Sequence, residues 1–281
     1  MLADYHVHSE FSDDSWYAVD DVCRDAIRLN LNEICFTDHV DYGVKPDADH
    51  ASLARVVDGK AIVNVDYPRY FPTLAAARER YAADLAVKRG LELGVQSHTI
   101  AENRAVIDRW GTEMDFAILS IHQVGDAEFW TGDFQRGRTQ QEYNDAYYAE
   151  MLKVVEGFSG YSVLGHLDLI KRYDPEGIYP FERSRDVIAE ILTRVIADGK
   201  GIEVNTSSFR YQLPDLQPST EILKLYRDLG GRIITIGSDS HEPGHLGSYI
   251  TLAKRHLAAL GYTAYCTFDA WEPVSHPIDE Q

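Results

Sequence analysis

The chain has 281 residues, of which 44% are hydrophobic and 26% are charged. This composition is ordinary for a globular protein, and it excludes disordered, collagen-like and disulfide-scaffold classes. The 27 Lys and Arg residues and the 45 Asp and Glu residues give a formal net charge of −18. Because such an acidic chain repels nucleic acids and anionic membranes at long range, we expect neither as a partner.

The chain contains three cysteines, Cys23, Cys35 and Cys266, and no CxxC pair. Since an odd number of cysteines does not favour a disulfide framework, we expect reduced thiols in a cytoplasmic protein. The N-terminal segment lacks the basic and apolar regions of a signal peptide. No run approaches the roughly 18 apolar residues that are needed to cross a bilayer.

Seven short apolar or β-branched runs alternate with longer segments of helical spacing. The runs are Leu2–His8, Glu33–His39, Leu91–Ser97, Phe116–His122, Ser162–Leu167, Gly201–Thr206 and Arg232–His241. Helical spacing is clearest in residues 19–31, 183–200 and 219–231, and the last of these ends at a pair of glycines. The alternation predicts βαβ units, a mainly parallel sheet and an α/β fold. Seven units without a clear linker favour a closed or nearly closed barrel over an open sheet, which would normally show a glycine-rich first turn.

Three further segments lack this regular pattern. Residues 41–70 and 129–143 have no strong periodicity, so we expect long loops there, and loops of barrels tend to carry function. The tail after Tyr265 is acidic and contains prolines, and we expect it to form a surface extension from about residue 266. We expect residues 1–281 to form one barrel domain.

Metal-ligating side chains recur at the ends of the predicted strands. They are His6, His8, Asp38, His39, Glu92, His122, His166, Asp239 and His241. His6 and His8 stand two residues apart, as do Asp239 and His241, and this spacing on a strand points both side chains to one face. Because the carboxyl ends of parallel strands meet at the mouth of a barrel, we expect these groups to converge there. A mixed set of imidazoles and carboxylates suits zinc, manganese or iron.

The chain resembles the polymerase-and-histidinol-phosphatase (PHP) superfamily, and most closely its histidinol-phosphate phosphatases. The resemblance lies in motifs spread from residue 6 to residue 242: HVHSEFSDDS, FTDHVDYG, the Glu92 run, LSIHQV, GHLDLIKRY, EVNTSSFR and IGSDSHEP. It implies a distorted (β/α)7 barrel with up to three divalent metal ions, manganese, zinc or iron, at the carboxyl ends of the strands. As a set the motifs are specific for the superfamily and less specific for the substrate.

The resemblance also implies which residues bind each metal. It assigns His6, His8, Glu92 and Asp239 to the first metal, Glu92, His122 and His166 to the second, and Asp14, His39 and His241 to the third. Some members of the superfamily have a histidine at the position of Asp14, and an aspartate can still bind a hard or borderline cation. Asp38, beside His39, either orients an imidazole or is an ordinary polar residue at a strand end.

Such a site predicts hydrolysis of a phosphate monoester. Two cations that share a water lower its pKa, so we expect direct attack by a metal-bridging hydroxide, with Asp239 or His241 helping to move a proton. The resemblance implies that the substrate is L-histidinol phosphate, an intermediate of histidine biosynthesis. The alternatives are a PHP phosphoesterase acting on another small phosphorylated metabolite or a nucleotide, and a non-catalytic metal-binding protein, which the intact set of ligands disfavours.

Phosphate also needs local positive charge in a chain this acidic. The candidates are Arg172, six residues after His166, and Arg210. An arginine can hold phosphate oxygens through two parallel N–H bonds, and Lys171 is a weaker alternative to Arg172. The sequence leaves the oligomeric state and the native metal open.

Overall fold

The structure is a computed structural model that describes residues 1–278. Seven strands follow one another in the order β1 (Ala3–Val7), β2 (Glu33–Phe36), β6 (Ala86–Gly94), β7 (Phe116–Ser120), β10 (Val163–Leu164), β11 (Gly201–Asn205) and β12 (Ile234–Gly237). Every neighbouring pair is parallel, and the short β3 (His39–Val40) pairs with β6 off this path. The predicted α/β fold, a distorted and nearly closed (β/α)7 barrel, is confirmed.

The first and last strands of the barrel, β1 and β12, meet at their carboxyl ends. Val7 forms a parallel bridge with Ser240, and the backbone N–H of His8 donates to the carbonyl of Ser240 at 2.8 Å. Below this contact the buried carboxylate of Asp4 accepts a hydrogen bond from the backbone N–H of Ser238 at 2.8 Å. These contacts bring the two ends of the chain's ligand set, more than 200 residues apart in sequence, to the same place.

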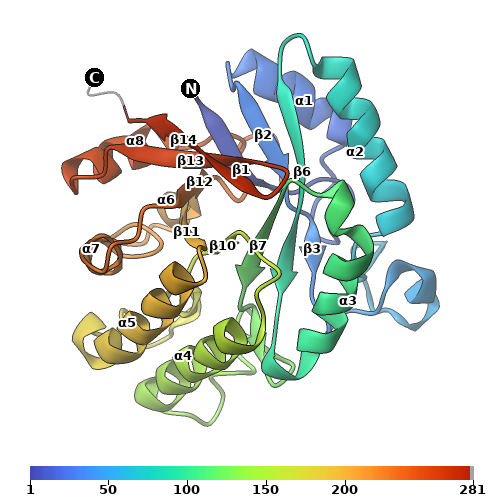
Figure 1. The fold of residues 1–281 in the computed structure, drawn as a ribbon. Coiled ribbons are helices and arrows are strands. Elements are labelled where there is room, and N and C mark those ends of the chain that lie inside the picture. Colours follow the sequence, from blue (N-terminus) through green and yellow to red (C-terminus); the bar gives the residue numbers. More distant parts are fainter. Residues whose placement is uncertain (279–281) are drawn as a thin grey trace.

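Helices surround the strands (Figure 1). They are α1 (Val19–Arg28), α2 (Tyr67–Tyr81), α3 (Ile100–Trp110), α4 (Gln140–Gly157), α5 (Phe181–Ala197), the short α6 (Ser207–Arg210), α7 (Thr220–Asp228) and α8 (Ile250–Ala259). The three helices predicted most clearly, α1, α5 and α7, are confirmed. In α5 the buried residues Ile188, Ile191 and Val195 recur at helical spacing, which gives the helix one face for the core.

The two predicted loops are confirmed over most of their length. Residues 41–66 hold a short 3-10 helix, Ala48–Leu53, and a small hairpin of β4 (Val56–Val57) and β5 (Lys60–Ala61). The loop prediction is wrong for residues 67–70, where α2 begins, and for 140–143, where α4 begins. The sequence does mark the start of α4, because Thr139 and Glu142 form a capping box there.

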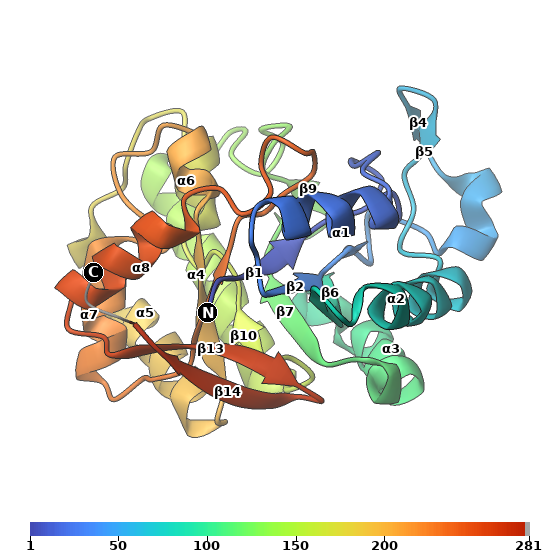
Figure 2. The same ribbon diagram turned by 90° about the horizontal axis from the view of Figure 1, so that it is seen from above.

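The prediction that the chain after Tyr265 forms a surface extension is wrong for the first of its two strands. β13 (Ala264–Asp269) and β14 (Glu272–Pro277) form an antiparallel hairpin across the amino-terminal end of the barrel (Figures 1 and 2). β14 is largely exposed, but β13 buries Cys266 and Phe268. The hydroxyl of Tyr5 donates to the carbonyl of Phe268 at 3.0 Å, so β13 packs against the first strand. β13 buries four consecutive residues, Tyr265–Phe268, and this short run of aromatic and β-branched residues is the strand signal that the acidic, proline-containing composition of the tail obscured.

Residues 279–281 lie outside the described part of the chain, so the single domain spanning residues 1–281 stays a prediction. Among residues 1–278, none of the helices combines the length and the apolar character that crossing a bilayer requires. The cytoplasmic location also stays a prediction.

Candidate metal centre

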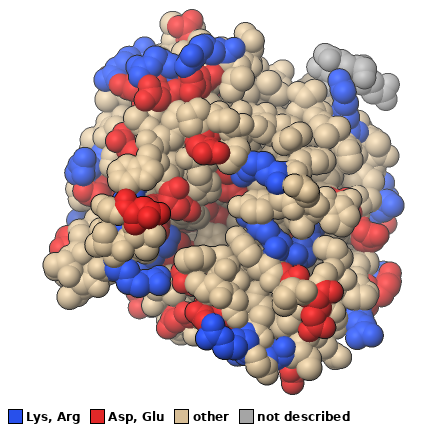
Figure 3. All heavy atoms as spheres, turned by 180° about the vertical axis from the view of Figure 1, so that it is seen from behind, with Lys and Arg blue, Asp and Glu red and all other residues tan. Residues whose placement is uncertain are grey.

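The structure brings all nine predicted ligands together at the carboxyl ends of the strands. The neighbouring groups are His6, His8 and Glu92; Glu92, His122 and His166; and His8, Asp14, His39 and His241; a fourth, His39, Asp41 and His122, overlaps the second and third. Within each group the ligand atoms lie within 4.8 Å of one another. Asp239 joins the first group, because its Oδ1 lies 3.7 Å from His6 Nε2 and 3.6 Å from His8 Nε2. The face opposite the β13–β14 hairpin is hollowed near its middle, with acidic and basic side chains around the hollow (Figure 3).

The first group fits a cation. His6 Nε2 and His8 Nε2 lie 3.1 and 3.4 Å from Glu92 Oε2. All three atoms are buried, and none has a hydrogen-bond partner among the described residues. Buried polar atoms are normally satisfied, so three lone-pair atoms that face one another without a partner are the arrangement that a metal ion would complete.

The second group is built around the other oxygen of Glu92. Its Oε1 lies 3.0 Å from His122 Nε2 and 2.8 Å from His166 Nε2. The hydroxyl of Ser120, at the end of β7, donates to the same oxygen at 2.7 Å. The two carboxylate oxygens of Glu92 therefore face different groups of imidazoles, as a carboxylate that bridges two cations would.

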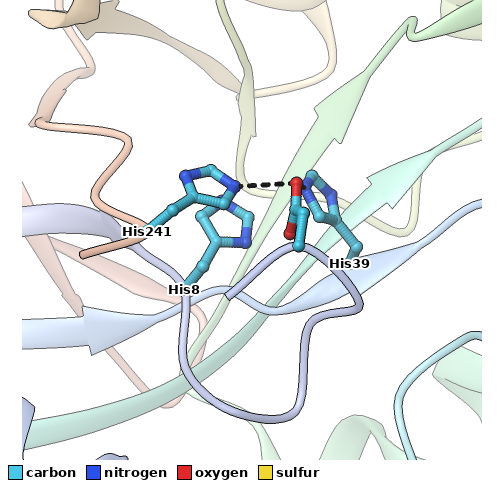
Figure 4. A group of neighbouring side chains, drawn as sticks. His8, His39 and His241 are labelled. Carbon is cyan, nitrogen blue, oxygen red and sulfur yellow. Dashed lines mark ion pairs between the residues drawn. The ribbon is translucent and has the colours of Figure 1, made fainter. Parts of the chain in front are cut away.

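The third group lies nearest the surface. Asp14 Oδ2 lies 3.5 Å from His39 Nε2 and 3.2 Å from His241 Nε2. Figure 4 shows His8, His39 and His241 of this group close together. The rings of His8 and His241 stack with their centroids 3.9 Å apart, which joins this group to the first. The side chain of Asp14 is 50% exposed, more than that of any other predicted ligand, so this group is the most open to solvent.

Asp38 orients an imidazole, but through an intermediate residue. Its carboxylate accepts hydrogen bonds from the backbone N–H of Ser9 and the hydroxyl of Ser12, both at 2.7 Å. The Ser12 hydroxyl in turn lies 3.0 Å from His8 Nδ1. Through Ser12 the carboxylate of Asp38 therefore reaches the ring of His8, and the same hydroxyl accepts a hydrogen bond from the backbone N–H of His39 at 3.2 Å.

The sequence reasoning missed two carboxylates that hold ligand imidazoles. Glu203 is fully buried in β11, and its Oε1 lies 2.6 Å from His6 Nδ1. Asp41 Oδ1 lies 2.7 Å from His122 Nδ1. A carboxylate on the far nitrogen of an imidazole fixes the ring and raises its basicity as a ligand. A charged residue inside the apolar run Gly201–Thr206 is the signal that could have identified Glu203.

The charges of Glu92 and His8 favour metal binding, whereas a cation must displace a proton from His6. Burial would raise the pKa of Glu92, but the neighbouring imidazoles, His6 first among them, hold it well below its usual range. Burial would lower the pKa of His6, but Glu203 and Glu92 raise it well above its ordinary value. For His8, burial and the adjacent His241 both lower the pKa well below its ordinary value. Glu92 is therefore ionised and His8 neutral near pH 7, the forms in which both bind cations.

Arg172 lies beside the first group. Its side chain is 7% exposed, and its Nη2 lies 3.5 Å from Asp239 Oδ2. The guanidinium donates to Gln217 Oε1 at 2.9 Å and lies 4.1 Å from the ring centroid of Tyr211. The alternative, Lys171, is turned to other partners, since its ammonium donates to Asp168 at 2.7 Å.

Arg210 contacts the backbone that carries Asp239. Its two terminal nitrogens donate to the carbonyls of Ser238 and Asp239, both at 2.8 Å. Asp239 has a φ of +57°, in the left-handed region that side chains rarely adopt. Arg210 therefore helps to hold a strained turn at the site, a contact that the sequence did not predict.

Comparison with known proteins decides the family. The family model of the PHP domain matches residues 4–207. The chain belongs to the PHP family. One relative, the histidinol-phosphatase of Lactococcus lactis, is 31% identical over 268 residues, which cover 94% of this chain and 93% of that protein. A probable histidinol-phosphatase of Thermotoga maritima is 28% identical over 265 residues, 93% of each chain.

Solved structures of related proteins match the fold over most of the chain. The crystal structure of histidinol phosphate phosphatase from Lactococcus lactis, complexed with zinc, L-histidinol and phosphate, has a TM-score of 0.82 and 29% identity. It covers 97% of this chain and 98% of that one. A structure of the putative histidinol phosphatase from Listeria monocytogenes, at 22% identity and a TM-score of 0.73, supports the fold alone. The PHP site of this chain is thus a cluster of His, Glu and Asp able to hold metal ions.

Proposed function

We propose that this PHP-family chain is a metal-dependent phosphatase that hydrolyses L-histidinol phosphate to L-histidinol and phosphate. The observation that carries the proposal is the set of three linked groups of imidazoles and carboxylates, with buried ligand atoms facing one another beside Arg172. Support comes from the Lactococcus lactis relative, whose crystal structure holds zinc, L-histidinol and phosphate and aligns with almost the entire chain.

We assign the ligands in three sets. They are His6, His8, Glu92 and Asp239 for the first cation, Glu92, His122 and His166 for the second, and Asp14, His39 and His241 for the third. Zinc is the cation that the relative supports best, and manganese and iron also suit mixed nitrogen and oxygen ligands. When bound, such cations lower the pKa of water and neutralise charge on the phosphoryl oxygens.

The chain's own charged groups prepare the site for the phosphate. Arg172 is held by Gln217 and stacked on Tyr211, so its guanidinium needs little reorganisation to bind a phosphoryl oxygen. We assign Arg210 to the same pocket as a second source of positive charge, besides its contact with the Asp239 backbone.

Asp239 and His241 are the pair we assign to proton transfer. His241 Nδ1 lies 3.1 Å from the backbone carbonyl of Asp239 and 3.6 Å from its Oδ1, so a small movement exchanges the carbonyl for the carboxylate as its partner. The pair can thereby take a proton from the attacking water and return one to the leaving alkoxide of the substrate.

A phosphate-release assay tests the proposal. Metal-loaded protein is given L-histidinol phosphate, p-nitrophenyl phosphate or mononucleotides, and we expect kcat/KM for L-histidinol phosphate to be about 100-fold or more above the others. A higher value for a mononucleotide would favour the alternative of a PHP phosphoesterase with another substrate. No release from any of these esters would contradict phosphatase activity.

A further inference from the structure

The loop that carries Asp14 differs from the other ligand positions. Residues 9–16, here called the Asp14 loop, follow β1 and contain no helix or strand. Of the nine predicted ligands Asp14 is the most exposed, at 50% of its side chain, whereas Glu92 is 1% exposed on a central strand. A carboxylate on an irregular loop keeps its place only if other parts of the protein fix the loop.

The residues that fix this loop come from a second irregular segment. Residues 44–63, here called the arm, contain β4 and β5, which project from the rim of the barrel (Figure 2). Lys60 of the arm contacts the Asp14 loop. Its ammonium group donates hydrogen bonds to the backbone carbonyls of Glu10, at 3.0 Å, Ser12 and Ser15. An ammonium has three protons to donate, so Lys60 uses all of them on this loop.

Lys45 holds the same loop from the base of the arm. Its ammonium lies 2.7 Å from Asp13 Oδ1 and 2.9 Å from Asp41 Oδ2, and the side chain is 9% exposed. The other oxygen of Asp41 contacts His122. Lys45 therefore ties the residue next to Asp14 to the carboxylate that orients a ligand of the second group.

We propose that Lys45 and Lys60 form a lysine clamp that positions the Asp14 loop for the third cation; the inference rests on the proposed function. Both are positioning residues, because their ammonium groups contact the loop and Asp41, and they act on the cation through Asp14. Without Lys60 three backbone carbonyls lose their shared donor, and the loop gains conformations in which Asp14 no longer lies between His39 and His241.

The clamp predicts a selective loss. Most ligands of the first two groups stand at strand ends or on central strands, so they depend on the arm less than Asp14 does. Loss of Lys60 should weaken the third site most, with a smaller effect on the first, because Ser12 of the same loop contacts His8 Nδ1 at 3.0 Å. Loss of Lys45 should weaken the third site and also the second, through Asp41.

The test compares Lys60→Met with Lys60→Arg and with the control Arg55→Met. Arg55 lies on the same arm, is 59% exposed and reaches only Glu128, at 3.6 Å, among the ion pairs of the described residues. Zinc titration followed by elemental analysis gives the affinity of each site. Hydrogen exchange of residues 9–16 in the metal-free protein reports the loop directly, without any contribution from catalysis.

We expect Lys60→Met to bind the third zinc ion about 10- to 100-fold more weakly, as removal of a partner that supports a metal ligand typically does. The Asp14 loop should exchange faster, Lys60→Arg should recover part of both effects, and Arg55→Met should match the wild type. Equal zinc affinity and equal exchange in Lys60→Met and wild type would overturn the clamp, as would a wild-type protein that binds no third zinc. Loss of the third zinc without any hydrolysis of L-histidinol phosphate by the wild type would instead contradict the proposed function and leave the clamp standing.

Discussion

The two ends of the barrel are built for opposite purposes. At the carboxyl end, His6 Nε2, His8 Nε2 and Glu92 Oε2 are buried without hydrogen-bond partners among the described residues, and Asp239 adopts a left-handed backbone. At the amino-terminal end, the hairpin side chain Phe268 packs in the core, with its ring centroid 5.0 Å from that of Phe116. The contrast teaches that one end of the fold accepts unsatisfied and strained groups for chemistry, while the other supplies apolar burial for stability.

The largest effect is expected when a predicted metal ligand at the carboxyl end is removed. His8→Ala should lower kcat/KM by about 100-fold or more and reduce bound metal, because metal ions supply several kcal/mol of transition-state stabilisation. Phosphate release and elemental analysis measure both effects, and circular dichroism should show an intact fold. The exposed His256 provides the control His256→Ala. Activity of His8→Ala within tenfold of wild type would remove His8 from the site.

The reverse change at the other end should cost stability and spare the chemistry. Phe268→Ala should reduce the free energy of unfolding by about 3–5 kcal/mol, because it leaves a cavity beneath the barrel. Denaturant titration measures the loss. Val274, 41% exposed on β14, gives the control Val274→Ala, for which we expect a change within about 0.5 kcal/mol. If kcat/KM of folded Phe268→Ala fell as far as that of His8→Ala, the two ends would not be separate in function.

A smaller effect is expected where a carboxylate only supports a ligand. Glu203→Gln removes the negative charge that faces His6 Nδ1, and zinc affinity of the first site should fall by about 10- to 100-fold. The matched control is Glu190→Gln on the exposed side of α5. Zinc titration of both variants decides the point, and an unchanged affinity in Glu203→Gln would show that Glu203 serves the fold alone.

The smallest effect concerns the pH dependence of the chelated protein. Burial would lower the pKa of His122, but Glu92 and Asp41 raise it to about 9. A base whose pKa is raised on folding stabilises the fold below its unfolded value of 6.5, and this contribution disappears as the pH rises through about 9. Thermal unfolding of metal-free protein should therefore show a loss of stability over this range that is reduced in His122→Asn. If wild type and His122→Asn lost the same stability over this pH range, the link between His122 protonation and folding would be wrong.

Much of the barrel and its ligand set could be predicted from the sequence, because both follow from local order. Strand ends are marked by His6, His8 and His122, and residues two apart on a strand necessarily share a face. A parallel barrel then brings such ends together without any detailed knowledge of packing.

The remainder depends on contacts between distant segments, which local patterns do not encode. Glu203 has its meaning only beside His6, 197 residues away, and Lys60 acts on carbonyls that carry no side-chain signature. In the sequence Phe268 looks like part of a polar tail, and only the packing of β13 against the barrel shows that it belongs to the core. In each case the partner, and not the residue type, defines the role.

The most direct test of the whole account is a crystal structure of zinc-loaded protein with anomalous scattering recorded at the zinc edge. The account predicts three peaks, one within each group of ligands, with Glu92 between the first two. Well-ordered side chains at these positions with no peaks between them would contradict it.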